Sequence, residues 1–413
     1  MDEGKNLIRS PKTVWYISKY LITPEDGDPV TRPIGLLRAL SLKGHRVIAF
    51  TSDSMGKYGA PRCSERIEVS KVDEIQLVRL KTFKFQKSLS IKRILSWLHF
   101  ELQLLRLPRH QFQNPDVIVV SSLSLLTVLN GIRLKRTFGS RLVFEVRDIW
   151  PLTLVSYTGL SEKNLAVRIL SGIEKLGYKH ADEIVGTMPN LVEHVRQVSN
   201  CTTRVHCVPM GADFQVLDEQ SHDEPGQLIP AGKPFTVGYA GSIGIANPLE
   251  SLLEVAKQIE GSLDVRFRIL GSGERKRDLE GQFDALMNVE FLDKVPKSMV
   301  NTFLRNCDLL YFAVRPGEIW RYGMSLNKVI DYMYSGRPII AEYEGHQSMI
   351  NESNCGFFIK PGDVDALKQT ILQCSQMDPA ELSAIGARGN RWLRENRNYE
   401  TLGKAYEDIL CGM

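Results

Sequence analysis

Cysteine pairs, long apolar runs and strong net charge are all missing from this sequence. Its seven cysteines are scattered, with no CxxC pair and no histidine nearby at zinc-binding spacing, which argues against a zinc site and a disulfide framework. No window of about 18 apolar residues occurs, so we expect no helix that spans a bilayer. The first apolar run, Val14–Ile17, is too short for the core of a secretory signal peptide. We therefore expect a cytoplasmic protein.

The charge balance also excludes a broad class of partner. The formal net charge is +4 over 413 residues, so no overall positive field indicates a nucleic-acid-binding protein. Repeats of solenoid period and low-complexity tracts are absent as well. A chain of this length exceeds one core of usual size, and we expect two domains of ordinary globular composition.

Strand-like apolar runs alternate with helical segments along most of the chain. In the first half the expected strands are Thr13–Ser18, Arg46–Ser52, Ile75–Leu80, Asp116–Ser121, Leu142–Arg147, Glu183–Thr187 and Val205–Pro209. A second series begins at Phe235 with FTVGYAG, VRFRILG, VEFLD, DLLYFAV and PIIAEY. Such alternation predicts βαβ units and mostly parallel sheets. The expected fold class is α/β, with two tandem Rossmann-like domains.

A stretch rich in Gln, Asp, Glu, Ser, Pro and Gly separates the two series. We expect an N-terminal domain over residues 1–212, a linker over 213–232 and a C-terminal domain over 233–395. Beyond them the sequence is helical to its end. We expect residues 396–413 to form a last helix that packs back toward the N-terminal domain.

Three segments of the C-terminal domain carry residues expected to bind an anionic ligand. The segment YGMSLNKVIDYMYSGRPII places a polar entry before a helix, and its candidates are Ser325, Asn327, Lys328 and Asp331. Helix starts in α/β domains bind nucleotide diphosphates, whose ribose needs an anionic partner. Two glycine turns follow expected strands, and their candidates are Gly241, Ser242, Gly244, Gly271 and Gly273. Each segment can equally be an ordinary crossover or tight turn without a ligand.

Charged residues end an expected strand of the N-terminal domain, in FEVRDIWP. Glu145, Arg147 and Asp148 are costly to bury there unless they pair with each other or act on a ligand. Asp148 can orient an acceptor hydroxyl or take its proton, and Arg147 can contact phosphate. A structural ion pair that supports the turn is the alternative.

The loop Ile22–Arg32, between the first strand and the first helix, is rich in Pro, Gly and Asp. Its length suits a substrate loop, and Arg32 is a candidate for binding an anionic group. A D-x-D triplet starts at Asp26 and another starts at Asp363 in an evident surface turn. We reject a metal site at both because such triplets are common by chance.

A basic and aromatic segment runs from Arg79 to Arg109. It holds eight basic residues against a single acid, Glu101, and interleaves them with Phe and Trp. From Ile91 onward one helical stripe carries Ile94, Leu95, Leu98, Leu102 and Leu105. Such a segment suits the surface of an anionic membrane. The alternative is an amphipathic helix that faces the core and keeps its lysines solvated.

Together these motifs resemble the retaining glycosyltransferases of family 4, in particular bacterial transferases that add an amino-deoxy sugar to a lipid carrier for O-antigen or capsule. The resemblance runs nearly end to end and rests on TPEDGDPVTRP, FEVRDIWP, GYAGSIG, LGSG, YGMSLNKVIDYMYSGRPII and NCGFFIKPGD. It implies the GT-B fold, with two Rossmann-like domains facing across a cleft and a C-terminal helix crossing back. It also implies a UDP-sugar donor, a polyprenyl-diphosphate-linked acceptor, no metal or other cofactor, and contact with the inner face of the cytoplasmic membrane through Arg79 to Arg109.

The resemblance assigns roles to the candidate residues. In the family an E-x7-E pair of glutamates flanks the donor. Asp331 occupies the second position and is expected to hydrogen-bond the ribose. The first position is Gly323, where this sequence departs from the family pattern. The cations that many members place after the glycine turn are absent, so Lys328 is the expected substitute on the diphosphate. Asp148, Arg147 and Lys328 are the catalytic candidates. Arg32 and Glu145 are the acceptor-binding candidates.

The resemblance implies a mechanism that retains the configuration at the anomeric carbon without a protein nucleophile. In it the leaving diphosphate takes the proton of the acceptor hydroxyl. Three other functions stay open. One is a nucleotide-sugar epimerase of the same fold. A second is a non-catalytic partner subunit, which the glycine in place of a glutamate at position 323 favours. A third is a transferase that makes a free metabolite such as sucrose phosphate.

Overall fold

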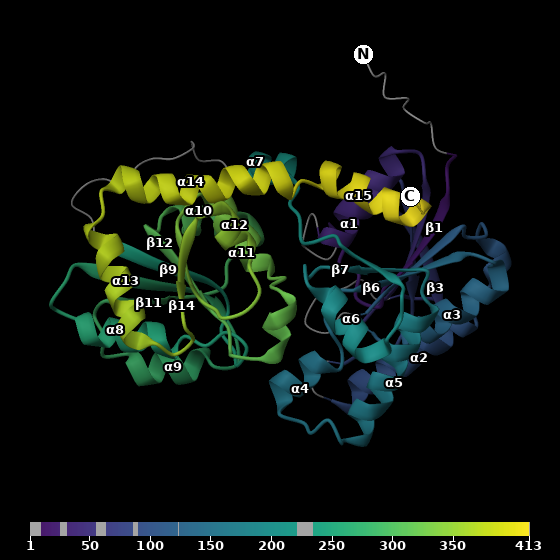
Figure 1. The fold of residues 1–413 in the computed structure, drawn as a ribbon, viewed down its shortest axis with the longest axis horizontal. Helices are drawn as coiled ribbons and strands as arrows, with labels where there is room; N and C mark the ends of the chain where they lie inside the picture. Colours follow the sequence, from purple (N-terminus) through teal and green to yellow (C-terminus); the bar gives the residue numbers. More distant parts are fainter. Residues whose placement is uncertain are drawn as a thin grey trace, which may run out of the picture. The chain divides into compact units, whose positions relative to one another are not determined.

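The computed structural model describes residues 10–24, 31–54, 63–85, 90–122, 124–220 and 234–412. The chain divides into two units, one made of residues 1–209 and 399–413 and the other of residues 210–398 (Figure 1). Each unit is built around one sheet covered by helices. Across the described ranges, no helix is long and apolar enough to cross a membrane.

The first unit holds an eight-stranded sheet in the order β3-β4-β2-β1-β5-β6-β7-β8. Its strands are β1 (Thr13–Ile17), β2 (Arg46–Ser52), β3 (Ile67–Val72), β4 (Ile75–Leu80), β5 (Val117–Ser121), β6 (Arg141–Val146), β7 (Glu183–Gly186) and β8 (Arg204–Cys207). Only the edge pair β3 and β4 is antiparallel among the described pairs. The central strand β1 is buried along its whole length, as expected for a parallel sheet covered on both faces.

The helices of the first unit connect these strands. They are α1 (Arg32–Leu42), α2 (Ile91–Leu105), the 3-10 turn η2 (Arg109–Gln111), α3 (Thr127–Phe138), α4 (Leu152–Thr158), α5 (Leu165–His180), α6 (Leu191–Ser199) and α15 (Tyr399–Cys411). Helix α1 begins where the sequence indicates: Thr31 is its N-cap, Pro33 lies in its first turn, and the chain leaves it at Gly44 with a φ of +88°.

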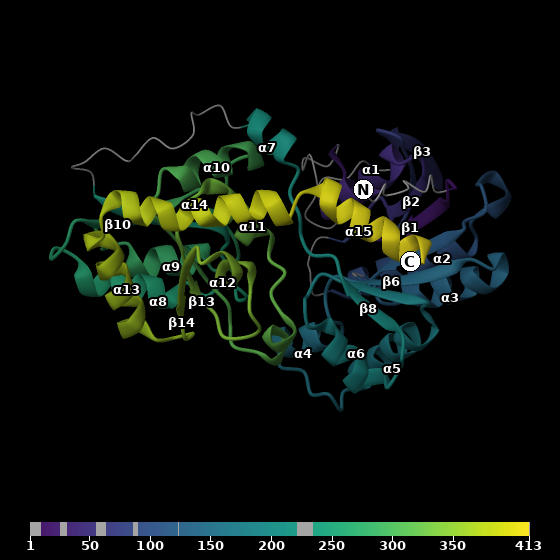
Figure 2. The same cartoon turned by 45° about the horizontal axis from the view of Figure 1, so that its top comes forward.

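The last helix, α15, packs along α1, and Figures 1 and 2 show the two side by side. Two glycines permit this close crossing. A Cβ on Gly35 would lie 2.4 Å from the Tyr399 ring, and one on Gly403 would lie 2.3 Å from the Ala39 Cβ. Side chains of α15, including Tyr406, complete the core of the first unit.

The second unit holds a six-stranded sheet in the order β11-β10-β9-β12-β13-β14, and all described pairs are parallel. Its strands are β9 (Phe235–Ser242), β10 (Val265–Ser272), β11 (Val289–Leu292), β12 (Leu309–Ala313), β13 (Ile339–Glu342) and β14 (Gly356–Ile359). Counted within the unit, this is the order 3-2-1-4-5-6 of a dinucleotide-binding Rossmann sheet. The predicted α/β class with two parallel-sheet domains is therefore confirmed.

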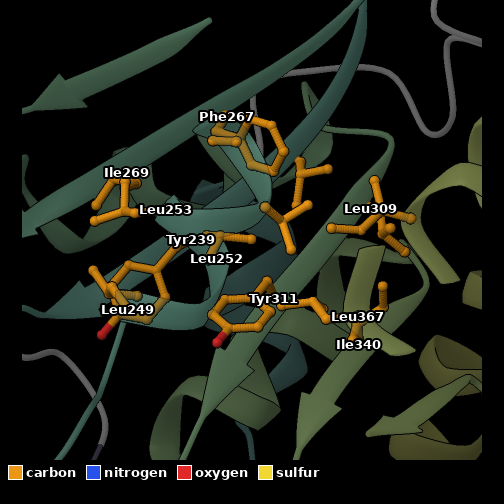
Figure 3. Close-up of a cluster of buried hydrophobic side chains, with 14 of the residues drawn as sticks. Tyr239, Leu249, Leu252, Leu253, Phe267, Ile269, Leu309, Tyr311, Ile340 and Leu367 are labelled. Carbon is orange, nitrogen blue, oxygen red and sulfur yellow. The ribbon is translucent and has the colours of Figure 1, made fainter. Parts of the chain in front are cut away.

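The helices of the second unit are α7 (Phe214–Gln220), α8 (Glu250–Ile259), α9 (Lys276–Phe283), α10 (Lys297–Arg305), the 3-10 turn η3 (Glu318–Tyr322), α11 (Asn327–Ser335), α12 (Met349–Ser353), α13 (Val364–Gln376) and α14 (Pro379–Asn396). Figure 3 shows the core on one face of this sheet, where Tyr239, Phe267 and Tyr311 of the strands meet Leu252 of α8 and Leu367 of α13.

Some segments differ from the expected pattern. Strands β3 and β14 were not predicted, and residues 214–220 of the expected linker form helix α7. This helix packs on the second unit, where Asp218 of α7 pairs with Arg394 and accepts a hydrogen bond from Tyr334. Residues 221–233 lie outside the described residues.

Candidate functional site

The carboxyl ends of β9 and β10 bring the predicted glycines of the second unit together. A Cβ on Gly271, whose φ is +156°, would lie 1.9 Å from the carbonyl oxygen of Gly241. A Cβ on Gly273 would lie equally close to the carbonyl oxygen of Ile243, at 1.9 Å. These two glycines are therefore required by the packing of one turn on the other.

Gly241 and Gly244 have a different environment. A Cβ on Gly241 would lie 3.3 Å from the Lys328 ammonium, and one on Gly244 would have no atom closer than 3.6 Å, where Glu274 lies. Ser242, between them, is exposed and its carbonyl accepts a hydrogen bond from Tyr239. The surroundings of Gly244 are therefore open, whereas a Cβ on Gly241 would also lie 3.0 Å from Tyr239 Oη.

Lys328 lies against that open turn, from the first turn of α11. Its ammonium donates to Asn247 Oδ1 at 2.6 Å and to Tyr239 Oη at 3.2 Å, and it lies 4.8 Å from the centre of the Tyr239 ring. Burial lowers the pKa of Lys328 to about 7. Among the residues that the structure describes, no carboxylate pairs with it. A half-buried cation with neutral neighbours is a favourable site for an anion.

Asp331 lies one turn further along α11, on the same side as Lys328 because the spacing is three residues. Its carboxylate forms an ion pair of 2.5 Å with Lys297, the first residue of α10. Sequence reasoning missed Lys297, which lies in no motif. Ser325 precedes α11 and Asn327 is its first residue, and their side chains make no hydrogen bond to another described residue.

Gly323, the departure from the E-x7-E pair, adopts a φ of +117°. A side chain is strained at such a φ, because L-residues rarely adopt it. A glutamate therefore does not fit at this position without a change of backbone. A ligand at this end of α11 would have to be recognised by other groups, of which Lys328 and Asp331 are the charged ones in the first turns of the helix.

In the first unit, Arg147 and Asp148 follow β6 directly. The hydroxyl of Ser122, after β5, accepts from the Arg147 N–H at 3.0 Å and donates to the Asp148 carbonyl at 3.2 Å. Thr187, after β7, donates to the Arg147 carbonyl at 3.2 Å. The neighbouring strand ends thus hold the backbone of this turn, a support that the sequence alone did not reveal.

The side chain of Asp148 makes no hydrogen bond or ion pair with another described residue. Burial raises its pKa above the ordinary value, and the nearby Arg147 only partly opposes this. A carboxyl group in such surroundings gains from a hydroxyl that donates to it. Asp148 therefore has the properties expected of a group that binds an acceptor hydroxyl.

Glu145 and Arg32, the other candidates of this unit, are fully buried and bind each other at 2.8 Å. Arg32 also donates to the Val208 carbonyl at 2.9 Å, and Glu145 accepts from Tyr16 at 2.7 Å and Tyr406 at 3.2 Å. Burial alone would raise the pKa of Glu145, but Arg32 and these donors hold it below its ordinary value. The pair has no exposed atom for an acceptor, and its contacts join α1, β6 and α15.

The apolar stripe of α2 faces outward. Ile91 is 77% exposed, Ile94 51% and Leu98 52%, whereas the buried side of the helix carries Phe100 and polar residues, including Glu101. The alternative reading, in which this stripe faces the core, is therefore wrong. Residues 25–30 of the opening loop, with its D-x-D triplet, and residues 86–89 of the basic segment lie outside the described residues.

Comparison with known proteins supports the fold over nearly the whole chain. Residues 234–377 match the family model described as glycosyl transferases group 1. The succinoglycan biosynthesis protein ExoL of Rhizobium meliloti (strain 1021) is 27% identical over 164 residues. That match spans 38% of this chain and 38% of the relative, so it covers well under half of either protein.

Solved structures of similar fold cover 97% of this chain. They include sucrose-phosphate synthase from Thermosynechococcus elongatus, with a TM-score of 0.72, 17% identity and all of that chain covered. A trehalose-6-phosphate protein from E. coli bound with UDP-2-fluoro glucose has a TM-score of 0.72 and 13% identity, with 99% of it covered. Anabaena HepE in complex with UDP and glucose has a TM-score of 0.64 and 13% identity, with 100% covered. The protein thus has the fold of the GT-B glycosyltransferases, and its residues 234–377 match the family model of glycosyl transferases group 1.

Proposed function

We propose that the protein is a retaining glycosyltransferase that moves a sugar from a UDP-sugar to a lipid-linked acceptor. The observation that carries the proposal is Lys328, a half-buried cation beside Gly241 of the glycine turn that pairs with no described carboxylate. The match of residues 234–377 to glycosyl transferases group 1 supports it. So does HepE, a similar structure reported in complex with UDP and with UDP-glucose.

The donor binds at the second unit in this proposal. The diphosphate lies over the turn from Gly241 to Gly244, with Lys328 against it, and the ribose hydroxyls donate to Asp331. Negative charge grows on the diphosphate as its bond to the anomeric carbon breaks, and a fixed cation there stabilises the transition state. Asn247 and Tyr239 hold the ammonium in place before the donor arrives.

The acceptor hydroxyl donates to Asp148 in this proposal. Its oxygen bonds to the anomeric carbon on the face from which the diphosphate leaves, so the configuration is retained. As the new bond forms, the hydroxyl proton passes from its hydrogen bond with Asp148 to the leaving phosphate oxygen, so Asp148 orients the hydroxyl and is neither the nucleophile nor the final proton acceptor. Arg147, the residue next to Asp148, contacts a phosphate group of the substrate. No metal ion enters this scheme.

The exposed face of α2 supports a lipid-linked acceptor. Apolar side chains that are half exposed on one helix, flanked by Lys92 and Arg106, fit the surface of an anionic membrane. We further propose that the transferred sugar is an N-acetylated amino-deoxy sugar and that the product is a bacterial surface polysaccharide, O-antigen or capsule. The partial match to a succinoglycan biosynthesis protein favours a polysaccharide product.

The test is calorimetric titration of the purified chain with UDP, with GDP and NAD as controls and EDTA present throughout. Saturable binding of UDP alone supports the donor assignment and its independence of metal. Binding of no nucleotide would favour the non-catalytic partner subunit. Donor turnover that needs no acceptor would favour the epimerase, and transfer to a free sugar phosphate would favour a metabolite-forming transferase.

Asp148→Asn tests the acceptor side separately. The change keeps the size of the side chain and removes its charge, so turnover should fall about tenfold to a hundredfold, the loss expected for one charge-assisted hydrogen bond to the acceptor hydroxyl. The UDP dissociation constant should stay within about twofold, because the donor binds at the other unit. Loss of both together would show that Asp148 has a structural role.

A further inference from the structure

One arginine of the second unit lies beside the glycine turn from Gly241 to Gly244. Arg315 comes two residues after the end of β12, and its side chain is exposed. Its Nε donates at 2.6 Å to the carbonyl of Ile245, the residue that follows the turn. Arg315 forms no ion pair with any residue that the structure describes. Its charge is therefore accessible at the turn and is not offset there by a bound carboxylate.

The backbone around Arg315 is held by neighbouring elements. The N–H of Val314 donates to the carbonyl of Glu342, at the end of β13, at 3.1 Å. The carbonyl of Arg315 accepts from the indole N–H of Trp320 at 2.7 Å. Trp320 is buried and meets Tyr343 edge to face at 5.9 Å. The side chain of Arg315 thus starts from a fixed position, and its bond to the Ile245 carbonyl directs the guanidinium to the glycine turn.

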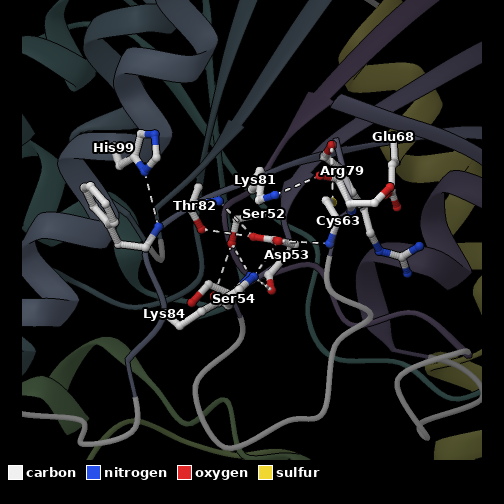
Figure 4. A network of polar contacts seen from close by, with 12 residues as sticks. Ser52, Asp53, Ser54, Cys63, Glu68, Arg79, Lys81, Thr82, Lys84 and His99 are labelled. Carbon is white, nitrogen blue, oxygen red and sulfur yellow. Dashed lines mark hydrogen bonds and ion pairs between the residues drawn. The ribbon is translucent and has the colours of Figure 1, made fainter. Parts of the chain in front are cut away.

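Two other cations near strand ends have a carboxylate partner. In the first unit, Lys84 lies beyond the end of β4 and pairs with Asp53 at 2.5 Å, as Figure 4 shows. In the second unit, Arg275 follows β10 and pairs with Glu250. Arg315 has no such partner among the described residues, so an anion can bind it without displacing a carboxylate.

The charges around the glycine turn show why a second cation matters. Residues 241–248 contain no charged side chain. Lys328 lies against the turn, but Glu274 does so too, with its Oε1 3.6 Å from the position of a Cβ on Gly244. These opposite charges offset each other, whereas the diphosphate of a nucleotide-sugar is dianionic. Arg315 makes the surroundings of the turn positive, and a guanidinium keeps its charge at a pH where Lys328 loses its own.

We propose that Arg315 binds the sugar-bearing phosphate of the donor, while Lys328 binds the phosphate next to the ribose. This assignment rests on the proposed function and adds a second cation to its donor site. Lys328 shares one side of α11 with Asp331, the expected ribose ligand, so the phosphate next to the ribose lies nearer to α11. Arg315 reaches the turn from the end of β12 instead, through Ile245.

The sugar-bearing phosphate is the one on which a guanidinium has the largest effect. Its bond to the anomeric carbon breaks, and the electron pair of that bond stays on the phosphate oxygen. The two terminal NH2 groups of Arg315 can donate to two oxygens of one phosphate. A cation held there before the reaction stabilises the charge as it grows.

Calorimetric titration with UDP and with UMP, which lacks the second phosphate, tests this assignment. Arg315→Gln keeps an N–H donor for the Ile245 carbonyl and removes the charge. It should weaken UDP binding about tenfold, the loss expected for one charge-assisted contact. UMP binding should change less than twofold. Arg315→Lys should restore part of the affinity for UDP, because it restores the charge without the planar fork of donors.

Arg266→Gln is the matched control. Arg266 is exposed near the amino end of β10, whereas the glycine turn follows the carboxyl end of the neighbouring parallel strand β9. Binding of both nucleotides should therefore change less than twofold. Equal losses of UDP affinity in Arg315→Gln and Arg266→Gln would show non-specific attraction and overturn the assignment. Equal losses for UDP and UMP in Arg315→Gln would also overturn it, because the guanidinium would then not act on the second phosphate.

The wild-type titration separates this inference from the proposed function. If the wild-type protein binds no UDP, the donor assignment fails and this inference fails with it. If the wild-type protein binds UDP and Arg315→Gln binds it equally tightly, this inference alone fails. Thermal unfolding of each variant checks that it is folded.

Discussion

Replacing Lys328 with Met should make the protein more stable and less able to bind UDP. Met has a similar length and no charge, so the change tests the ammonium group rather than packing. Burial lowers the pKa of Lys328 from the ordinary 10.5 to about 7. Each pKa unit is worth about 1.4 kcal/mol, so keeping this cation in the folded protein at pH 7 costs about 5 kcal/mol.

The sign of the effect follows from proton binding. The pKa of Lys328 is lower in the folded than in the unfolded protein, so the unfolded protein binds more protons between about pH 7 and pH 10. The free energy of unfolding therefore rises as the pH rises through this window. Met removes the cost of burying the charge, and the two lost hydrogen bonds offset about 2 kcal/mol of that gain. A net gain of about 2 to 3 kcal/mol should raise Tm by about 5 °C or more.

The same shift predicts proton uptake when UDP binds. At pH 8 Lys328 is mostly neutral in the free protein, and a diphosphate beside it draws a proton onto the amine. Calorimetry in two buffers with different ionisation enthalpies should therefore show uptake approaching one proton per UDP at pH 8 and less at pH 6. In Lys328→Met the uptake should vanish and the dissociation constant should rise about tenfold to a hundredfold.

Lys257→Met is the control for this experiment, because Lys257 is exposed on α8. It should alter neither Tm nor proton uptake. The reasoning is refuted if wild-type protein binds UDP at pH 8 without taking up a proton. It is equally refuted if Lys328→Met lowers Tm, since that would mean that the ammonium stabilises the fold.

Other substitutions test the remaining contacts. Asp331→Ala should raise the UDP dissociation constant about tenfold or more by removing a charge-assisted hydrogen bond; unchanged affinity in calorimetry would remove Asp331 from the site. Glu145→Gln should lower the free energy of unfolding in urea by about 3 kcal/mol, because Arg32 is left without a buried counterion; a stable variant would show that the pair is not needed. Gly273→Ala should lower Tm because its Cβ meets the Ile243 carbonyl, whereas Gly281→Ala in α9, with no atom within 4 Å, should not; equal Tm values for the two variants would contradict the packing argument.

The strands were predictable because a buried parallel strand is a continuous apolar run bounded by polar residues. β1 and β12 read this way, and both are buried throughout. β3 does not, since this antiparallel edge strand mixes half-buried Glu68 and exposed Lys71 with apolar residues. Stripe periodicity also identified α2 as a helix but gave no information on which side faces the core. That depends on Glu101, which hydrogen-bonds with Thr127 and Asn130 of α3.

The candidate site was predictable where it follows a strand or starts a helix. Lys328 and Asp331 were found from the spacing of one segment, and the structure shows what surrounds them. Lys297 and Ser122 were not found, because no local sequence pattern marks them. They matter only because the fold brings Lys297 near Asp331 and Ser122 near the turn at Asp148. Arg315 was missed for a related reason: a single arginine after a strand is common in sequence, and only its contact beside the glycine turn makes it unusual.

Glu145 and Asp148 show how one strand end separates a structural acid from a reactive one. Glu145 hydrogen-bonds with Arg32, Tyr16 and Tyr406, and the attraction of Arg32 and Arg147 together with the Arg32 and Tyr16 hydrogen bonds holds its pKa low despite burial. Asp148, three residues on, has its backbone held by Ser122 while its carboxyl group has no described partner and its pKa is raised. A carboxyl group that is paired on all sides cannot exchange a partner for substrate without a large cost. A carboxyl group without a partner destabilises the free protein, and a hydroxyl that donates to it offsets that cost. Turnover should therefore depend on Asp148 rather than on Glu145.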